Sequence, residues 1–207
     1  MCGRFFMDPE EKDVRDALEK INRSPLKRRF EEAESALTAG GEVRPGDVVP
    51  ALALSRTGSP GVFPMRWGYR TDIDGKSRLI INARSETAGQ KPLFRDGLAR
   101  RRCLLPMSRY FEWARETAPD GRKRAGRKYA VTPRSDGPVL LAGLYRMEMG
   151  LPVFVVLTRD PSRDVAFLHD RMPVLLRAAD ADIWLNGDVP PEETLLRALT
   201  RVEPVPA

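Results

Sequence analysis

The chain has 207 residues, of which 42% are hydrophobic and 31% are charged, a composition typical of a globular protein that can bury one core. The 35 lysines and arginines outnumber the 29 aspartates and glutamates, and the net charge of +6 favours a polyanionic partner such as nucleic acid. Two cysteines exclude a disulfide framework, and there is no signal peptide or apolar run of membrane-spanning length, so we expect one cytoplasmic domain over residues 1–207.

The chain begins with a cysteine at position 2, directly after Met1. Removal of Met1, which a small second residue favours, leaves Cys2 with a free α-amine and a thiol two carbons apart. An α-amine has a pKa of roughly 7.7–8.0, so part of it is neutral and nucleophilic near neutral pH. Such a pair can attack an aldehyde twice, first forming an imine and then closing a five-membered thiazolidine. The alternative is that Cys2 belongs to an ordinary frayed terminus.

Two helices are predicted near the start of the chain. Asp8 as the N-cap, Pro9 at the first helical position and Glu11 as the partner in a capping box predict the start of the first helix. Apolar residues then recur at helical spacing, at Val14, Ala17, Leu18 and Ile21. A second short helix is expected over residues 28–39, ended by Gly40-Gly41.

From residue 48 onward, short β-type runs broken by glycine and proline predominate. The predicted strands are Val48–Leu54, Val62–Trp67, Leu79–Asn82, Cys103–Leu105, Tyr110–Trp113, Lys128–Thr132, Val139–Met147 and Val153–Thr158. The basic segment Gly121–Lys128 is interpreted as a hairpin tip or as a loop that follows phosphates, and two helices are expected near Ala179–Leu185 and Glu192–Leu199. The pattern predicts an α+β fold with a curved, mostly antiparallel sheet and flanking helices.

Two positions beyond Cys2 are candidates for proton transfer. His169 is the only histidine of the chain, and it titrates near neutrality, although a lone histidine is also a common structural hydrogen-bonding residue. Without a second histidine a zinc site is poorly supported. Glu112 lies among aromatic residues in Tyr110–Trp113, where desolvation raises the pKa of a carboxyl group; the alternative is an exposed strand glutamate.

Asn82 and Arg84 follow an apolar run and lie two residues apart, so in an extended chain their side chains point to the same side. An amide and a guanidinium at a strand end can clamp a phosphate or a sugar. The alternative is a turn that begins a helix at Ser85 or Thr87.

Together these motifs resemble the SOS response-associated peptidase (SRAP) family of abasic-site processing proteins, over residues 1–184. The segments that carry the resemblance are Met1–Phe5, Trp67-Gly68, Asn82–Thr87, Arg101–Pro106, Phe111–Trp113, Ala142–Tyr145, Thr158 and His169–Val174. The resemblance implies a barrel-like core, no metal or cofactor, and a monomer that acts on abasic sites in single-stranded DNA in the nucleoid.

The resemblance also implies roles for the candidate catalytic residues. Cys2, once Met1 is lost, forms a thiazolidine crosslink with the aldehyde of the abasic site. Glu112 protonates the leaving hydroxyl and assists removal of Met1. His169 helps to open the deoxyribose ring and to reverse the crosslink, and Asn82 positions the amino terminus.

Four further residues are expected to contact DNA by the same resemblance, namely Arg84 at a phosphate, Arg4, Trp67 and Thr158. Cys103 lies in an apolar strand and is expected to be a small buried residue without a catalytic role.

The sequence departs from the family pattern in three places. Arg70–Lys76 lacks the proline and tryptophans that many members carry there, Glu42–Gly46 replaces the usual Asn-x-Ala-Pro, and Arg109 replaces a common glycine. These departures bear on DNA shape preference more than on the chemistry of Cys2.

Two other functions remain possible for the sequence. One is a noncovalent single-stranded nucleic-acid-binding protein, favoured by the positive charge. The other is a cysteine peptidase that cleaves other proteins, with Cys2 as nucleophile and His169 as base.

Overall fold

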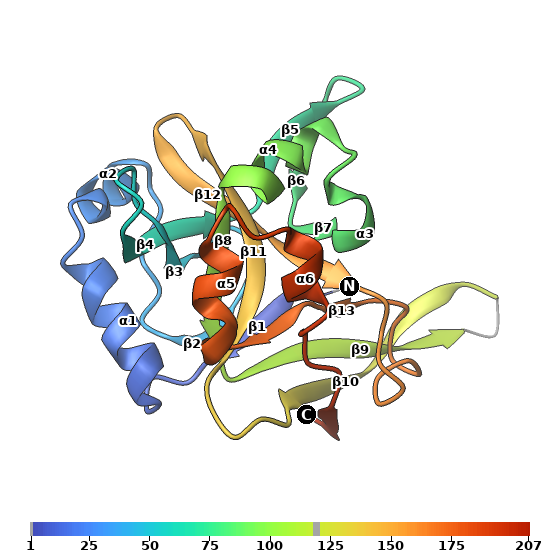
Figure 1. Cartoon of the computed structure of the whole chain (residues 1–207). Coiled ribbons are helices and arrows are strands. Elements are labelled where there is room, and N and C mark those ends of the chain that lie inside the picture. The colour runs from blue at the N-terminus through green and yellow to red at the C-terminus, as the bar shows by residue number, and fades with distance from the viewer. Residues whose placement is uncertain (1, 118–120) are drawn as a thin grey trace.

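The structure, a computed structural model, describes residues 2–117 and 121–207 (Figure 1). Its helices are α1 (Lys12–Asn22), α2 (Leu26–Glu32), α3 (Ser85–Ala88), α4 (Pro92–Arg100), α5 (Ala181–Leu185) and α6 (Pro191–Leu195). Its strands are β1 (Arg4–Met7), β2 (Gly41–Val43), β3 (Val48–Leu54), β4 (Pro60–Trp67), β5 (Tyr69–Ile73), β6 (Lys76–Ile80), β7 (Asn82–Arg84), β8 (Arg102–Met107), β9 (Arg109–Thr117), β10 (Lys123–Pro133), β11 (Val139–Glu148), β12 (Leu151–Arg159), β13 (Met172–Pro173), β14 (Leu175–Arg177) and β15 (Val202–Pro206).

The centre of the fold is a closed barrel of five strands in the order β12-β4-β3-β8-β11, closed because β12 pairs with both β4 and β11. β12 and β4 run parallel, whereas the other neighbours in the ring run antiparallel. Alternate residues of β12 pack on opposite sides, as the strand period of two requires: Phe154 and Val156 pack with Trp67, whereas Val153 and Val155 pack in the core that includes α4 and α5 residues. The predicted α+β fold with a barrel-like core is confirmed.

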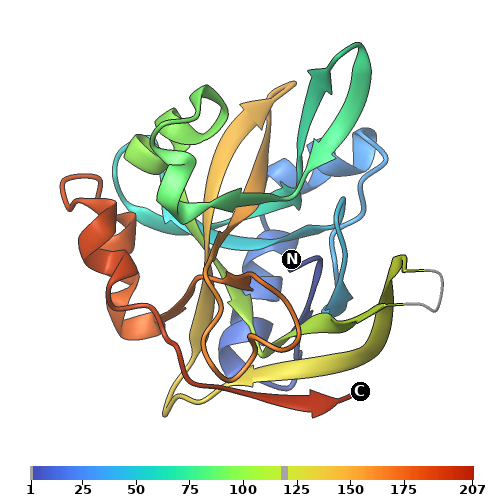
Figure 2. The same cartoon turned by 90° about the vertical axis from the view of Figure 1, so that its right-hand side faces the viewer.

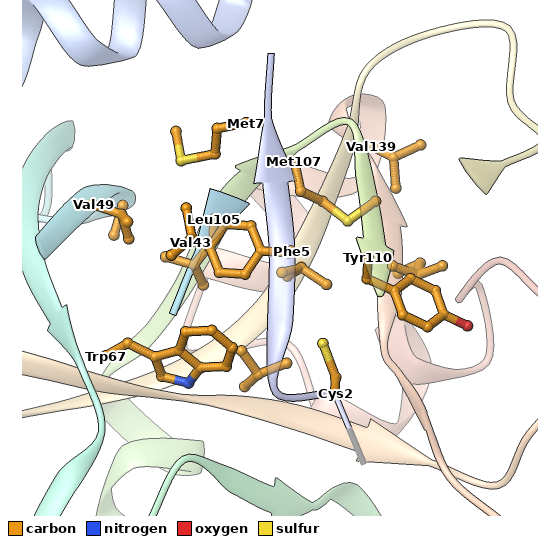
Figure 3. Close-up of a cluster of buried hydrophobic side chains, with 14 of the residues drawn as sticks. Cys2, Phe5, Met7, Val43, Val49, Trp67, Leu105, Met107, Tyr110 and Val139 are labelled. Atoms are coloured by element: carbon orange, nitrogen blue, oxygen red, sulfur yellow. The ribbon is translucent and has the colours of Figure 1, made fainter. Parts of the chain in front are cut away.

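A second sheet, in the order β15-β10-β9-β1-β2, places the start of the chain. β1 lies between β9 and β2 and runs antiparallel to both. Phe5 and Met7 point into the core and are completely buried, which anchors the strand that follows Cys2 (Figure 3). In both views the start of β1 lies between two protruding hairpins, β5–β6 and β9–β10 (Figure 2).

Several predicted boundaries were wrong. The second helix spans Leu26–Glu32 instead of residues 28–39, and the last spans Pro191–Leu195 instead of Glu192–Leu199. Two further differences have a local cause. The first helix begins at Lys12 instead of Pro9, because Asp8 forms a turn in which its carboxylate accepts the N–H of Glu10 and its carbonyl accepts the N–H of Glu11. The basic segment Gly121–Lys128 is largely strand, because β10 begins at Lys123 and continues through a β-bulge between Ala125 and Lys128.

Trp67 and Trp184 have the largest side chains among the fully buried residues that the structure describes. The indole N–H of Trp67 donates to the carbonyl of Ile81 at 2.9 Å, and its ring lies 6.0 Å from that of Phe154 and 5.3 Å from that of Phe5.

We expect Trp67→Ala to lower the free energy of unfolding by about 3–5 kcal/mol, because it empties a packed site and removes the hydrogen bond to Ile81. Urea denaturation followed by circular dichroism measures this loss. Leu196→Ala is the control, since the Leu196 side chain is 88% exposed and such changes stay within about 0.5 kcal/mol. A loss below about 1 kcal/mol for Trp67→Ala would contradict the assigned packing.

Candidate active site

Cys2 is held at the start of β1 by the body of the protein. Asn82, the first residue of β7, donates its side-chain N–H to the carbonyl of Cys2 at 2.9 Å. β7 in turn is fixed by parallel pairing with β12, in which Asn82 lies opposite Val156. The backbone of Cys2 is therefore tied to the barrel on one side and, through β1, to β9 on the other.

The thiol of Cys2 is completely buried, and its Sγ lies 3.8 Å from the carbonyl oxygen of Arg4. Figure 3 shows the side chain directed into the same cluster as Phe5 and Tyr110. Burial raises the pKa of this thiol to about 12, and the negative charge of Glu112 acts in the same direction. In the chain that retains Met1, Cys2 is therefore a neutral thiol and its nitrogen belongs to a peptide bond.

This burial predicts poor reactivity of Cys2 in the chain that retains Met1. The thiolate is the reactive form, and its fraction rises about tenfold per pH unit below the pKa. We therefore expect iodoacetamide at pH 8 to label Cys2 far more slowly than a free cysteine, and labelling to accelerate as the pH rises toward about 12. Peptide mass spectrometry measures the rate, and denatured protein is the control. Rapid labelling of native Cys2 at pH 8 would contradict the buried thiol.

Glu112 lies next to Cys2 on β9, between β1 and β10. The β1–β9 pairing sets Arg4 opposite Phe111, and this register brings Glu112 alongside the residues that precede Arg4. The Glu112 residue is 7% exposed, and its carboxylate accepts the backbone N–H of Trp113 at 3.2 Å. A buried carboxylate within electrostatic range of the amino-terminal cysteine can exchange protons with a group bound there.

His169 lies in the loop between β12 and β13 and has three polar neighbours. Its Nδ1 lies 2.7 Å from Oδ1 of Asp170 and 3.0 Å from the backbone nitrogen of Arg171, and its Nε2 lies 2.9 Å from Nη2 of Arg115. Desolvation by burial lowers the pKa of His169, and the positive charge of Arg115 acts in the same direction, against the negative charges of Glu112 and Asp170. The ring is therefore mostly neutral at pH 7.

A pocket of about 610 Å³ is lined by half of the predicted site residues. The sequence-predicted members of its lining are Asn82, Arg84, Thr158 and His169. Its other lining residues are Ile80, Ala83, Lys91, Leu93, Phe94, Arg115, Asp170 and Arg171. Cys2 does not line this pocket but is hydrogen-bonded to Asn82, which does. The charge of Glu112 acts on both Cys2 and His169. The structure thus brings the four expected catalytic residues into one region.

The sequence did not single out Lys91, Arg115, Asp170 or Arg171 as site residues, although Asp170 and Arg171 lie in the recognised motif around His169. The side chain of Arg171 is 11% exposed and pairs with Glu86 at 2.7 Å and Asp160 at 2.6 Å, so it fixes the loop to α3. For Arg115 the sequence gives only a weak indication of a role at the site, which is its position three residues after Glu112 on the same strand.

Cations and aromatic rings surround the start of β1. The Arg4 guanidinium lies 5.4 Å from the centre of the Trp113 ring, and the Lys128 ammonium lies 3.8 Å from that of Phe111. Glu42 pairs with both cations, at 2.6 Å from Arg4 and 2.7 Å from Lys128, and the hydrogen bond from Lys128 is the main cause that lowers its pKa. Glu42, which lies in a segment that departs from the family pattern, thus offsets the positive charges of Arg4 and Lys128 near Cys2.

Two residues expected at the DNA are buried in the structure. Trp67 is completely buried with its indole N–H bonded to Ile81, so its ring is not available to a base and its role here is packing. Thr158 is 1% exposed, and its hydroxyl donates to the carbonyl of Ala83 at 3.3 Å. Thr158 therefore forms part of the pocket wall, and a DNA contact from it stays a prediction.

Neither a metal centre nor a membrane span is found in the parts of the chain that the structure describes. Residues 2–117 and 121–207 hold no group of three or more potential ligands of the His, Cys, Asp or Glu types. In the same residues no helix is long and apolar enough to cross a membrane.

The fold resembles those of solved proteins of low sequence identity. A phage-related protein from Bordetella bronchiseptica superimposes with a TM-score of 0.68 at 24% identity, covering 100% of this chain and 94% of that one. A protein from Bacteroides thetaiotaomicron has a TM-score of 0.68 at 22% identity, covering 94% of this chain and 85% of that one. Both show the fold alone.

Sequence relatives extend the comparison. The abasic site processing protein YoaM of Bacillus subtilis is 29% identical over 199 residues, which cover 90% of this chain and 79% of that protein. The abasic site processing protein YedK of Escherichia coli is 28% identical over 205 residues, which cover 93% and 83%. The model of the family described as SOS response associated peptidase (SRAP) matches residues 1–206, which confirms the resemblance seen in the motifs. The chain therefore belongs to the SOS response-associated peptidase family.

Proposed function

We propose that the protein processes abasic sites in single-stranded DNA and that, after loss of Met1, Cys2 forms a thiazolidine crosslink with the aldehyde of the opened sugar. The 2.9 Å hydrogen bond from Asn82 to the carbonyl of Cys2 carries this proposal, because it joins the amino-terminal cysteine to the basic pocket. The names of the curated relatives agree with an abasic site as the substrate.

The crosslinking step needs one proton donor next to the amine. The α-amine of Cys2 adds to the aldehyde carbon and gives a carbinolamine. Glu112, 7% exposed and near Cys2, donates a proton to the hydroxyl, which leaves as water and gives a protonated imine. The proton on the nitrogen returns to the Glu112 carboxylate and leaves a neutral imine. Sγ of Cys2 then adds to the imine carbon, its proton passes to the nitrogen, and the ring closes. The net change is the loss of one water.

Before this step the deoxyribose ring must open. A base removes the proton of the anomeric hydroxyl, the bond from C1′ to the ring oxygen breaks, and the ring oxygen takes up a proton. His169 lines the pocket, and burial lowers its pKa, so the neutral form that accepts a proton predominates at pH 7. The opening is neutral overall, because one proton leaves and one is added.

Arg84 is exposed at the pocket and is the proposed phosphate contact, with Lys91 on the same lining. Loss of Met1 by self-cleavage, with Glu112 assisting, belongs to the same proposal.

The decisive experiment is the intact mass of the protein after mixing with a single-stranded oligonucleotide that carries one abasic site. We expect a heat-stable species with the mass of the protein lacking Met1 plus DNA minus one water. The same oligonucleotide without the lesion is the control and gives no such species. Loss of Met1 without any adduct would refute the proposal, and retained DNA binding would then support the noncovalent function.

A further inference from the structure

One large aromatic side chain is exposed beside the candidate active site. Phe167 is 59% exposed and lies two residues before His169, in the loop between β12 and β13. Two residues of extended chain span at most about 7 Å, so the backbone of Phe167 lies close to the pocket that His169 lines. Among the residues that the structure describes, no other phenylalanine, tyrosine or tryptophan is exposed.

The residues on either side of Phe167 hold it in this position. Val165 and Leu168 are 3% and 1% exposed and pack in the core. The backbone N–H of Leu168 donates to the carbonyl of Val165 at 2.9 Å and closes a tight turn. This turn buries both aliphatic side chains and leaves the ring of Phe167 outside. Because the backbone is already fixed, a ligand that stacks on the ring loses less free energy to ordering it.

Tyr129 of β10 contacts the ring of Phe167 from one side. The two ring centres lie 5.7 Å apart and the ring planes meet at 85°, which is an edge-to-face contact (Figure 1). In such a pair Tyr129 covers at most one face of the Phe167 ring, so the other face is free of it. Tyr129 also lies directly opposite Glu112 in the β9–β10 pairing. The aromatic pair therefore borders the strand that carries the proposed proton donor.

We propose that Phe167 is a base-stacking residue, whose free face binds the nucleobase next to the abasic site in single-stranded DNA. A base beside an abasic site lacks a stacking partner on that side, because the lesion has no base. A flat aromatic ring takes the place of the missing base, and such stacking tolerates any sequence because every base has a π face. The placing of the lesion rests on the proposed function, whereas the stacking of a base on Phe167 does not.

The pocket supplies the charges that this mode of binding needs, but no free ring. Arg84, Lys91 and Arg115 line it and suit phosphates of the DNA backbone. Phe94 also belongs to the lining, but it is only 6% exposed and packs in the core. A basic surface that follows the backbone, together with an exposed ring for a base, is the usual arrangement for binding single strands. Phe167 supplies that ring.

Photocrosslinking tests the contact directly. The oligonucleotide carries tetrahydrofuran, an abasic analogue without an aldehyde, and 5-iodouracil as the base on one side of it or the other. Irradiation breaks the carbon–iodine bond, and C5 of the uracil bonds to a carbon of the ring it touches, with loss of hydrogen iodide. We expect peptide mass spectrometry to place the crosslink at Phe167. A crosslink that maps only to other residues would overturn the proposal, as would equal crosslinking from a base three nucleotides away.

Substitutions of Phe167 separate ring stacking from simple apolar contact. We expect Phe167→Ala to bind the tetrahydrofuran oligonucleotide about 5–100-fold more weakly, which is the affinity that one stacked base usually contributes. Phe167→Leu is apolar but has no flat face, so it should show most of the same loss, whereas Phe167→Trp should restore the affinity. Fluorescence anisotropy measures binding. Because the side chain is 59% exposed, all three variants should fold as the wild type does.

Met147→Ala is the matched control. The Met147 side chain is also apolar and 51% exposed, but it lies on β11 opposite Pro152, near the start of β12, whereas the loop of Phe167 follows the end of β12. Its affinity should stay within about twofold of the wild type, as is usual for a surface substitution. Wild-type affinity in both Phe167→Ala and Phe167→Leu would contradict the stacking.

The stacking and the proposed function can fail separately. If abasic DNA forms the adduct but no base crosslinks to Phe167, the stacking is refuted and the function stands. If 5-iodouracil in undamaged DNA crosslinks to Phe167 but abasic DNA forms no adduct, the proposed function fails and the stacking stands.

Discussion

Cys2→Ala is expected to abolish the heat-stable adduct with abasic single-stranded DNA, because the variant has an amine but no sulfur to close the ring. Its amine can still form an imine, which water hydrolyses. Denaturing electrophoresis and intact mass after heating measure the loss. Noncovalent affinity for the undamaged oligonucleotide should stay within about twofold of the wild type, since the buried Cys2 side chain has no phosphate partner to lose.

Cys103→Ala is the matched control for this experiment. Cys103 is the other cysteine; it is also completely buried, and burial raises the pKa of its thiol strongly. It lies on β8 in the barrel, opposite Gly143 of β11, and contributes packing alone. We expect Cys103→Ala to form the adduct at the wild-type rate. An adduct that survives Cys2→Ala and disappears in Cys103→Ala would show that Cys103 is the nucleophile and would contradict the proposal.

Glu112→Gln is expected to slow crosslinking by about 10²–10⁴-fold, the usual contribution of a positioned general acid. The amide keeps the size of the side chain and can still accept the N–H of Trp113, so the fold should be retained. It cannot donate a proton to the carbinolamine hydroxyl as a carboxylic acid does. Single-turnover kinetics at saturating abasic oligonucleotide measure the rate, with protein whose Met1 has been removed beforehand by an aminopeptidase.

Glu116→Gln supplies the control on the same strand, where the Glu116 side chain is 45% exposed and pairs with Arg124. Its crosslinking rate should equal that of the wild type within about twofold, because changing an exposed carboxylate removes only a weak ion pair. Equal rates for the two variants would remove Glu112 from the mechanism. Mass spectrometry of Glu112→Gln as purified tests self-cleavage separately, since retained Met1 is then expected.

The local parts of this protein could be predicted from its sequence. The strand Val48–Leu54 has the observed bounds, because a run of apolar residues between Gly46 and Gly58 leaves little freedom for its ends. The residues now placed around the pocket, such as Asn82 and His169, belong to motifs that were visible without a structure. Their roles stay predictions until the chemistry is measured.

Long-range packing could not be predicted in the same way. Trp67 lies in a recognised motif, yet only the closure of the barrel shows that its ring is buried against Phe154. Arg115 and His169 are 54 residues apart in the chain and meet where β9 passes the loop that follows β12, a tertiary contact that no local pattern encodes. The turn at Asp8 shows that a purely local contact can also defeat a prediction. The hydrogen bond from Glu10 to the Asp8 carboxylate forms a turn where the capping residues predicted the start of a helix.

The position of β1 between β2 and β9 has a consequence for the order of events during synthesis. The amino-terminal strand leaves the ribosome first, but its partner Arg109–Thr117 follows only after roughly 5–20 s at the usual rate of translation. Until then the amino terminus has no β9 to pair with and stays accessible to an aminopeptidase. Asn82 and His169 are also still absent or unplaced. The proposed self-cleavage, in contrast, needs Glu112 of β9 beside the amino terminus, so it can begin only once this strand has been made and paired. Met1 found removed from chains still on the ribosome and shorter than β9 would therefore point to an aminopeptidase.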